Sequence, residues 1–374
     1  MKQRKGPHPL SMHLGMAASA YAGMQDYASN IAAQYDHDDL IKMVEGIQKY
    51  QNCTYASDAP PLNRIWQRGH TSIMCGAKKA QENETVHAPL LIIPSLVNRS
   101  TIFNLNKRRS FVSWMSERSI PTYLIDWGGI YDESSSQNIE KIIHEIIPET
   151  IRFVSDRHGC KPNVLGYCIG GALSLGAAAH DPQSIGKIIL LATPWDFHRQ
   201  GMTLSERVRL WAPFALSSIE QKGYLPQQWL QSLFVSLDPS GSIKKFKAFA
   251  HMDMNSDDAK LFVDVEDWLN DNVSLPADIA QHCIQEWFAK NALAKNEWYI
   301  AGNHVDLSSI ENDIMIVASD KDRLVPFHCA VPLEKTVHAA RCTTLRASCG
   351  HIGFIAGKNA IEKIWMPMET WLKI

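Results

Sequence analysis

The chain has 374 residues, a formal net charge of −2, and 45% hydrophobic against 20% charged residues. This composition excludes the disordered and fibrous classes, and the near-neutral charge disfavours a nucleic-acid binder, which normally carries a basic surface. The length exceeds that of a typical domain, so we expect one large core with an insertion or extension of about a hundred residues, or two domains.

Eight cysteines are present, and no two of them form a C-x-x-C pair. Neither a disulfide framework nor a zinc ribbon is therefore expected, and no metal site is predicted. The longest strongly apolar run, residues 89–97, is about half of what a membrane span needs. No secretory leader is recognised in residues 1–24. We expect a cytoplasmic protein without a transmembrane segment.

Residues 1–75 are predicted to form a helical N-terminal extension, and residues 76–374 a catalytic domain. Within the extension, Leu40, Met43, Val44 and Ile47 recur near the helical period.

From residue 88 onward, short apolar runs alternate with helical patterns. Strands bounded by turn residues, each followed by a helix, indicate a parallel sheet covered on both faces. The alternation stops near residue 195 and resumes at residue 313. Residues 198–300 are predicted as a helical cap insertion over the carboxyl ends of the strands, where open α/β sheets bind ligands. The predicted strands lie at residues 89–97, 121–127, 163–168, 185–195, 313–322 and 342–351.

A nucleophile-elbow pattern stands at residues 166–171, Gly-Tyr-Cys-Ile-Gly-Gly, between a predicted strand and a predicted helix. It matches G-x-S-x-G with cysteine in place of serine. The sharp turn would present Cys168 at the end of the sheet, where a helix N-terminus favours a thiolate. Cys168 is the predicted nucleophile; the alternative is a small buried cysteine in a tight turn.

A base and an orienting acid are expected downstream, in the order nucleophile, acid, histidine. Asp320 and Asp322 follow one predicted strand, and His351 follows the last. His351 would deprotonate the thiol and later activate the next nucleophile, and Asp322 would orient its imidazole. Asp320 is the rival acid, with a turn-forming role as its alternative. The alternative for His351 is a loop histidine that caps main-chain groups.

An oxyanion hole needs two main-chain amides. We predict one at Ile169, directly after the nucleophile, and the other at Val97, in the loop after the first core strand. A plain strand exit is the alternative for Val97. The sequence has no Walker A loop, no G-x-G-x-x-G and no H-E-x-x-H, so no nucleotide, dinucleotide or zinc chemistry is indicated.

Beyond the residues above, the sequence carries the segments PLLIIPSLVNRSTIFNL, YLIDWG, GYCIGG, ATPWDF, GNHVDLSSI, DRLVP and GHIGF. Taken in order, these segments resemble the polyhydroxyalkanoate synthase family over residues 88–374. The resemblance implies an α/β-hydrolase fold: a mostly parallel sheet with helices on both faces and a helical cap insertion. It implies that Cys168, Asp322 and His351 form the family's triad, with Val97 and Ile169 as oxyanion donors.

The resemblance also implies an acyltransferase. It would move (R)-3-hydroxyacyl groups from coenzyme A thioesters through an acyl-Cys168 enzyme to a growing polyester, with no cofactor beyond the thioester substrate. The chain looks most like the short, class III-type synthases, which implies a second synthase subunit or a homodimer as partner and polyester granules as the location. Two alternatives stay open: a Cys-dependent thioesterase or polyester depolymerase, and a non-catalytic granule-associated protein.

Overall fold

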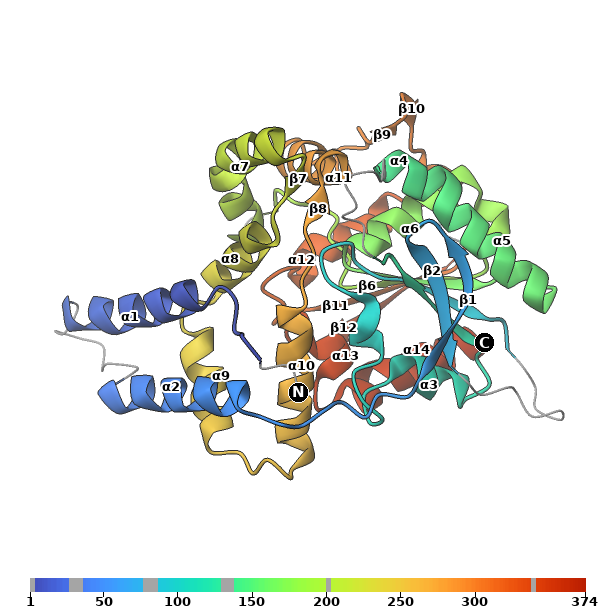
Figure 1. Cartoon of the computed structure of the whole chain (residues 1–374). Helices are drawn as coiled ribbons and strands as arrows, with labels where there is room; N and C mark the ends of the chain where they lie inside the picture. Colours follow the sequence, from blue (N-terminus) through green and yellow to red (C-terminus); the bar gives the residue numbers. More distant parts are fainter. Residues whose placement is uncertain (1–3, 27–35, 77–86, 129–137, 200–202, 338–340) are drawn as a thin grey trace. The chain divides into compact units, whose positions relative to one another are not determined.

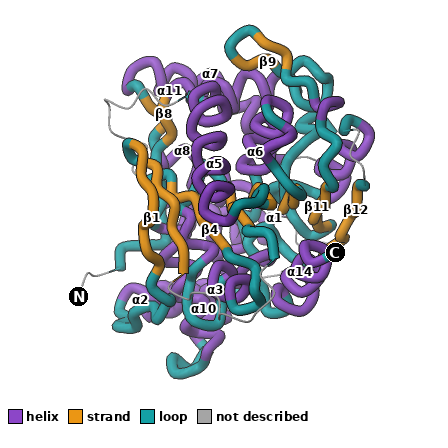
Figure 2. Tube along the Cα trace, turned by 90° about the vertical axis from the view of Figure 1, so that its right-hand side faces the viewer, coloured by secondary structure: helices purple, strands orange, loops and turns teal. Residues whose placement is uncertain are grey.

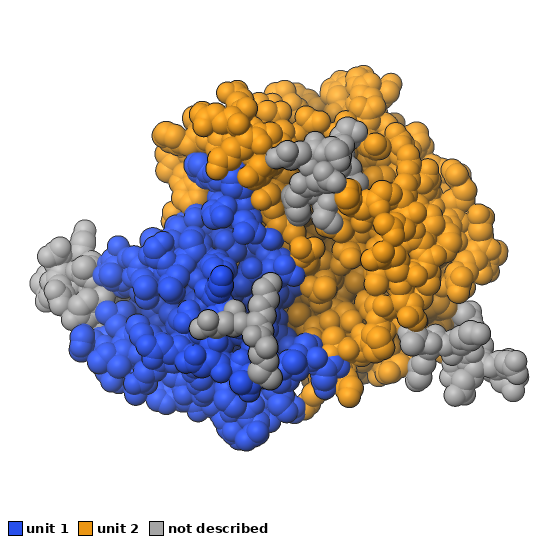
Figure 3. Space-filling view, in the orientation of Figure 1, with its two compact units in different colours: residues 1–58, 226–272 blue, residues 59–225, 273–374 orange. Residues whose placement is uncertain are grey.

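An eight-stranded sheet organises residues 59–225 and 273–374, one of two units into which the chain divides (Figure 3). The other unit comprises residues 1–58 and 226–272. The computed structural model describes residues 4–26, 36–76, 87–128, 138–199, 203–337 and 341–374, and the account below concerns these residues.

The strand order of the sheet is β1-β2-β4-β3-β5-β6-β11-β12. β1 and β2 form an antiparallel hairpin, and β2 pairs antiparallel with β4. The remaining strands in this order, β4, β3, β5, β6, β11 and β12, run parallel to one another. The strands are β1 (Leu62–Arg68), β2 (Thr71–Gly76), β3 (Leu90–Ile93), β4 (Thr122–Asp126), β5 (Asn163–Tyr167), β6 (Ile188–Leu191), β11 (Ile314–Ser319) and β12 (Cys342–Ala347).

Helices cover both faces of this sheet, which is why its central strands are apolar along their whole length. Figures 1 and 2 show α5 and α6 on one face and α3 and α14 on the other. The rings of Phe111 and Trp365 meet edge to face at 5.2 Å and join α3 to the C-terminal helices. The helices are α3 (Phe111–Ser116), α4 (Ile139–Lys141), α5 (Ile147–His158), α6 (Ile169–His180), α7 (Thr203–Lys222), α11 (Ala277–His282), α12 (Phe327–Ala330), α13 (Gly353–Ala356) and α14 (Met366–Lys373).

Shorter elements complete this unit. β7 (Tyr224–Leu225) pairs with β8 (Leu275–Pro276), and β9 (Tyr299–Ile300) pairs with β10 (Asn303–His304). Residues Ile142–Ile146, Cys283–Ala289 and Ile361–Trp365 are π-helical, and they adjoin α5, α11 and α14 in the chain.

The sheet confirms the predicted fold class, an α/β-hydrolase fold. Its parallel strands are the apolar runs expected from residue 88 onward, and a cysteine elbow follows β5. The extension expected over residues 1–75 is shorter than predicted, because residues 62–76 form the β1–β2 hairpin instead of helix. Gly69, with φ +56°, makes the tight turn of that hairpin, and Ile73 of β2 is fully buried.

Among its described residues, the other unit contains the helices α1 (Leu10–Asp26), α2 (His37–Gln51), α8 (Gln227–Leu237), α9 (Gly241–Ala250) and α10 (Asp257–Asn270). Its core packs Met43, Ile47 and Tyr50 of α2 against Phe246 and Phe249 of α9. Gly46 lets α2 approach α9 closely, since a Cβ there would lie 2.0 Å from the Phe246 carbonyl oxygen.

Residues 198–300, expected as one cap insertion, are helical over much of their length but belong to two units. Residues 226–272 group with the N-terminal helices, and the flanking parts stay with the sheet. The Arg4 guanidinium makes two 2.7 Å bonds to the Asp267 carboxylate of α10, and Tyr50 Oη donates to the same group. Such long-range contacts have no local sequence signature. No helix within the described ranges is long and apolar enough to cross a membrane.

Candidate active site

Cys168 occupies a sharp turn between β5 and α6. Its backbone lies at φ 53° and ψ −124°, a conformation that non-glycine residues rarely adopt. The Cys168 amide donates to the Leu191 carbonyl of β6 at 2.9 Å, and its carbonyl accepts from the Gly171 amide at 2.9 Å. Such strain costs about 1–3 kcal/mol and persists only where the surroundings enforce it. The turn is therefore built as the sequence pattern predicts, with a partly exposed thiol at its apex.

Glycines allow the backbones around this turn to approach one another. A Cβ on Gly170 would lie 2.1 Å from the Ile93 carbonyl oxygen, and one on Gly166 would lie 2.4 Å from the Cα atom of Gly171. No real Cβ atom tolerates such distances, so β3, β5 and α6 can meet here only without side chains at these positions.

We expect the Gly170→Ala variant to be destabilised by roughly 3 kcal/mol, because the new methyl group would collide with the main chain of β3, which cannot give way as a flexible side chain would. Urea unfolding measures the change. Gly76→Ala at the end of β2 is the matched control, since its Cβ would have no atom within 4 Å. Equal stabilities of the two variants would contradict the close approach at the elbow.

His351 and Asp322 form a hydrogen-bonded pair at the carboxyl ends of β11 and β12. His351 Nδ1 and Asp322 Oδ2 are 2.7 Å apart, and the Asp322 side chain is fully buried. The other carboxylate oxygen, Oδ1, accepts from the amides of Leu324 and Val325 at 2.8 and 3.0 Å. The main chain therefore holds the carboxylate so that Oδ2 faces the imidazole.

The rival acid, Asp320, is engaged elsewhere. Its carboxylate accepts two bonds from Arg346, at 2.7 and 2.8 Å, on the exposed side of β12. Of the two candidate carboxylates, the structure brings only Asp322 to His351.

Burial and two neighbouring groups act on the pKa of His351. Burial lowers its pKa, but the Asp322 carboxylate and the Cys168 thiolate raise it more strongly, so that the pKa lies at about 10. The ordinary value is 6.5. Cys168 therefore lies close enough to the imidazole to contribute to this rise. The elbow and the histidine loop are thus close enough to act together, and the charged form of His351 is favoured.

Replacing Asp322 by asparagine will remove the charge that favours the imidazolium and will lower the pKa of His351. We expect the half-maximal rate of Cys168 alkylation to move to higher pH, because a neutral imidazole no longer stabilises the thiolate. Iodoacetamide labelling with peptide mass spectrometry measures this profile. An unchanged labelling profile would contradict the coupling of Asp322 to Cys168 through His351.

In the wild type, the raised pKa of His351 contributes stability that is fully present below pH 6.5 and is lost as pH rises through about 10.

The main-chain amides of the two predicted oxyanion donors, Ile169 and Val97, differ in their hydrogen bonding. Ile169 is the first residue of α6, where a helix leaves its amides without an internal acceptor. The Val97 amide donates to Ser95 Oγ at 3.2 Å, within the loop that follows β3. The Ile93 carbonyl of that loop's strand faces Gly170. Val97 would therefore have to share or release the Ser95 hydroxyl to bind an oxyanion.

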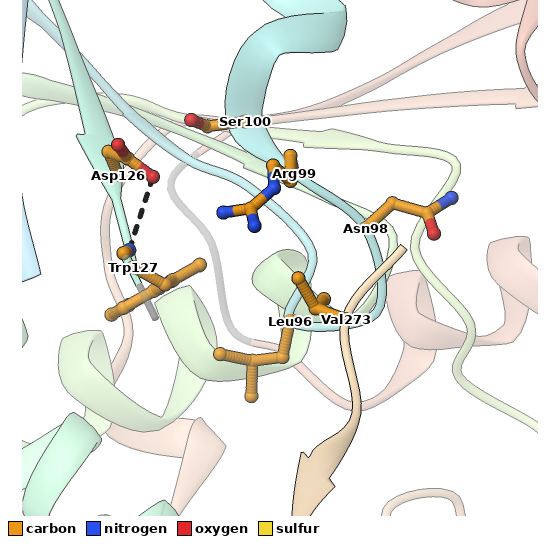
Figure 4. Close-up of a pocket in the computed structure, with 8 residues that line it drawn as sticks. Leu96, Asn98, Arg99, Ser100, Asp126, Trp127 and Val273 are labelled. Carbon is orange, nitrogen blue, oxygen red and sulfur yellow. Dashed lines mark hydrogen bonds between the residues drawn. The ribbon is translucent and has the colours of Figure 1, made fainter. Parts of the chain in front are cut away.

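A small pocket lies beside this loop, at the ends of β3 and β4. Figure 4 shows Arg99 extending from the loop toward Asp126 and Trp127. The Asp126 carboxylate accepts from the Gly128 amide at 3.2 Å, and the Trp127 indole donates to the Pro94 carbonyl at 3.2 Å. Cys168, Asp322 and His351 are not among the residues that line the pocket. The pocket therefore lies apart from the predicted reacting groups.

Asp196, in the loop after β6, forms a hydrogen bond that joins this loop to Asn291. Its Oδ1 accepts from Asn291 Nδ2 at 2.9 Å, and Asn291 Oδ1 accepts from the Phe197 amide at 2.8 Å. Asn291 is 5% exposed and follows the π-helical segment Cys283–Ala289. The reciprocal bonding anchors the loop after β6 to that segment.

Tyr167 is a residue of the site that the sequence did not single out. Within G-x-C-x-G it occupies an unrestricted position, yet its ring stacks on the His351 imidazole with centroids 5.3 Å apart. A large aromatic residue directly before the nucleophile was the only available signal.

In the part of the chain that the structure describes, no group of three His, Cys, Asp or Glu side chains is placed to hold a metal ion.

Comparison with known proteins gives matches along most of the chain. The family model described as "Protein of unknown function (DUF3141)" matches residues 107–339. The chain is 24% identical over 370 residues to the poly(3-hydroxyalkanoate) polymerase subunit PhaC of Haloarcula marismortui, covering 97% of this chain and 76% of that protein. It is 27% identical over 288 residues to the PhaC subunit of Haloferax mediterranei, covering 76% of this chain and 58% of that protein.

Among solved structures, the monoacylglycerol lipase of Paleococcus ferrophilus matches with a TM-score of 0.49 and 14% identity, over 77% of this chain and 96% of that one.

Proposed function

Since the chain belongs to the family described as "Protein of unknown function (DUF3141)" and is related to poly(3-hydroxyalkanoate) polymerase subunits, we propose that it is an acyltransferase of the polyhydroxyalkanoate synthase type. The substrates would be coenzyme A thioesters of (R)-3-hydroxy acids, and the product a polyester. The observation that carries this proposal is a cysteine at the elbow, coupled to a buried His351–Asp322 pair, in a chain with these relatives.

The first half-reaction forms an acyl-enzyme. The Cys168 thiolate attacks the thioester carbonyl, the carbonyl oxygen takes the negative charge, and the Ile169 amide donates to it. The tetrahedral intermediate collapses, the bond to the coenzyme A sulfur breaks, and the imidazolium of His351 donates a proton to the leaving thiolate. Asp322 keeps the imidazole oriented throughout.

The second half-reaction transfers the acyl group. The neutral His351 takes the proton from the hydroxyl of a 3-hydroxyacyl unit, whose oxygen attacks the Cys168 thioester. A new ester bond forms, and Cys168 leaves as a thiolate beside the imidazolium. Thiol exchange between coenzyme A and Cys168 replaces one thioester by another, so the energy of the activated acyl group is retained for ester formation.

The proposal includes no cofactor beyond the thioester substrate. The relatives are named as subunits, which supports a second synthase subunit as partner; a homodimer is the alternative assembly. A polyester product would place the protein at the surface of cytoplasmic granules.

Incubation with (R)-3-hydroxybutyryl-coenzyme A tests the function. Free coenzyme A is followed with a thiol reagent, and the product is sized by chromatography. Release of thiol with a high-molecular-mass polyester supports the proposal. Release of thiol with free 3-hydroxybutyrate would show that water accepts the acyl group, and the protein would then be a thioesterase. Absence of thiol release from folded protein, alone and with a partner subunit, would refute acyl transfer from this substrate.

A further inference from the structure

Besides the bond between His351 and Asp322, the buried hydroxyl of Ser319, the last residue of β11, attaches the loop that carries His351 to the end of that strand. Ser319 Oγ donates to the Cys349 carbonyl at 2.6 Å and accepts from the Cys349 amide at 2.9 Å. It also accepts from the Lys321 amide at 3.2 Å. The Ser319 residue is fully buried. One side chain thus fixes the main chain two residues before the histidine and three residues before the acid.

This contact begins where the sheet ends. β11 and β12 pair in parallel register up to Ser319 and Ala347, the last residues of the two strands. The paired register of the two strands ends at these residues. The two bonds between Ser319 and Cys349 join the two segments two residues beyond the last residue of β12. They therefore fix the start of the histidine loop relative to β11.

A second buried hydroxyl holds the histidine loop from the elbow strand. Tyr167 Oη donates to the His351 carbonyl at 3.3 Å, and its ring stacks on the imidazole at an interplanar angle of 29°. Tyr167 is 3% exposed, and its ring meets Phe103 edge to face. Burial and the negative charges of Cys168 and Asp322 raise the pKa of Tyr167 well above its usual value, so the phenol remains a donor.

We propose that Ser319 and Tyr167 are positioning residues, which hold the His351 imidazole between the Cys168 thiol and the Asp322 carboxylate. The inference rests on the proposed function of the triad and deepens it. The imidazole has two partners, and a displacement of its main chain by less than an ångström would lengthen one of the two contacts. Misplacement on the order of 1 Å costs about a hundredfold in rate in well-ordered sites. The two hydroxyls fix the main chain at His351 and at Cys349, on either side of Gly350.

Labelling of Cys168 by iodoacetamide tests the proposal without any acyl substrate. The variants are Ser319→Ala and Tyr167→Phe, and the reaction of the Cys168 peptide is followed by mass spectrometry from pH 5 to 9. We expect Ser319→Ala to slow the reaction at neutral pH by about tenfold and to move its half-maximal rate to higher pH, and Tyr167→Phe to do so by about threefold. Ser319→Thr, which keeps the hydroxyl, should restore most of the rate.

Matched controls separate positioning from general stability. Thr150→Val removes a fully buried hydroxyl that donates to the Ile147 carbonyl in α5, and Tyr123→Phe removes a phenol that bonds to His158. Both should lower the thermal midpoint and leave the labelling profile unchanged.

A folded Ser319→Ala variant with the wild-type rate and profile would overturn the role of Ser319. If that variant does not fold, Tyr167→Phe with an unchanged profile would overturn the proposal. Because labelling needs no thioester, failure of acyl transfer leaves this outcome interpretable.

Discussion

The Cys168→Ala variant will release coenzyme A from (R)-3-hydroxybutyryl-coenzyme A at least about 10⁴-fold more slowly than the wild type, because removal of the nucleophile of such a triad leaves only binding and oxyanion contributions. The backbone strain at this position is unchanged by alanine, so the thermal midpoint should stay close to that of the wild type. Thiol release at saturating substrate measures the rate.

Cys160→Ala is the control for this variant. Cys160 is an exposed cysteine after α5, and its loss should change neither the rate nor the stability. If Cys168→Ala retains even a tenth of the wild-type rate, the acyl group does not pass through the elbow and the assignment of the nucleophile is wrong.

Replacing His351 by glutamine will reduce thiol release by about 10³-fold, in the range that general acid–base residues contribute. Glutamine keeps much of the side-chain volume and can still bond to Asp322, but it can neither carry the proton nor stabilise the Cys168 thiolate. Labelling of Cys168 by iodoacetamide at neutral pH should slow in parallel, because the thiolate loses its cationic partner.

The matched control for His351→Gln is His304→Gln, since His304 lies exposed on β10 and bonds to the Asn296 carbonyl. Its rate and labelling should equal those of the wild type. A His351→Gln variant whose Cys168 reacts normally would show that another group governs the thiol.

The elbow could be predicted from sequence because its constraints are local. A strand, a turn with Gly166 and Gly170 on either side of Cys168, and a helix follow one another within about twenty residues. The close approach to Ile93 explains why glycine is required at position 170, and the positive φ of Cys168 is the strain that such a turn stores. The expected order of nucleophile, acid and histidine along the chain then predicted which two later loops carry the acid and the histidine.

Asp322 was preferred over Asp320 as the acid in the prediction from sequence, but the two residues stand only two positions apart in the same loop, and the physical reason for the preference lies in the fold. The direction of the loop decides it: the amides of Leu324 and Val325 turn the Asp322 carboxylate inward, whereas Arg346 of β12 takes Asp320. The contacts of Ser319 and Tyr167 could not be predicted from sequence, because they join residues that are far apart in the chain. Ser319 contacts a residue 30 positions away, and Tyr167 contacts one 184 positions away.

The boundaries of the N-terminal part were wrong where long-range packing decides them. Residues 62–76 carry polar residues on the exposed face of a hairpin, which hides its strand pattern. The helical unit joins α2 to α9, nearly two hundred residues later, through the approach of Gly46 to Phe246. A local pattern predicts the helices but not the division of residues 198–300 between two units.

The most direct test of the account is to trap the acyl-enzyme and locate the acyl group. The protein is mixed with (R)-3-hydroxybutyryl-coenzyme A, quenched in acid within the first turnover, digested and analysed by mass spectrometry. The account predicts one or more 3-hydroxybutyryl units in thioester linkage on the peptide that contains Cys168, and none in the Cys168→Ala variant. An acyl group on a different residue, or turnover without any acylated Cys168 peptide, would contradict it.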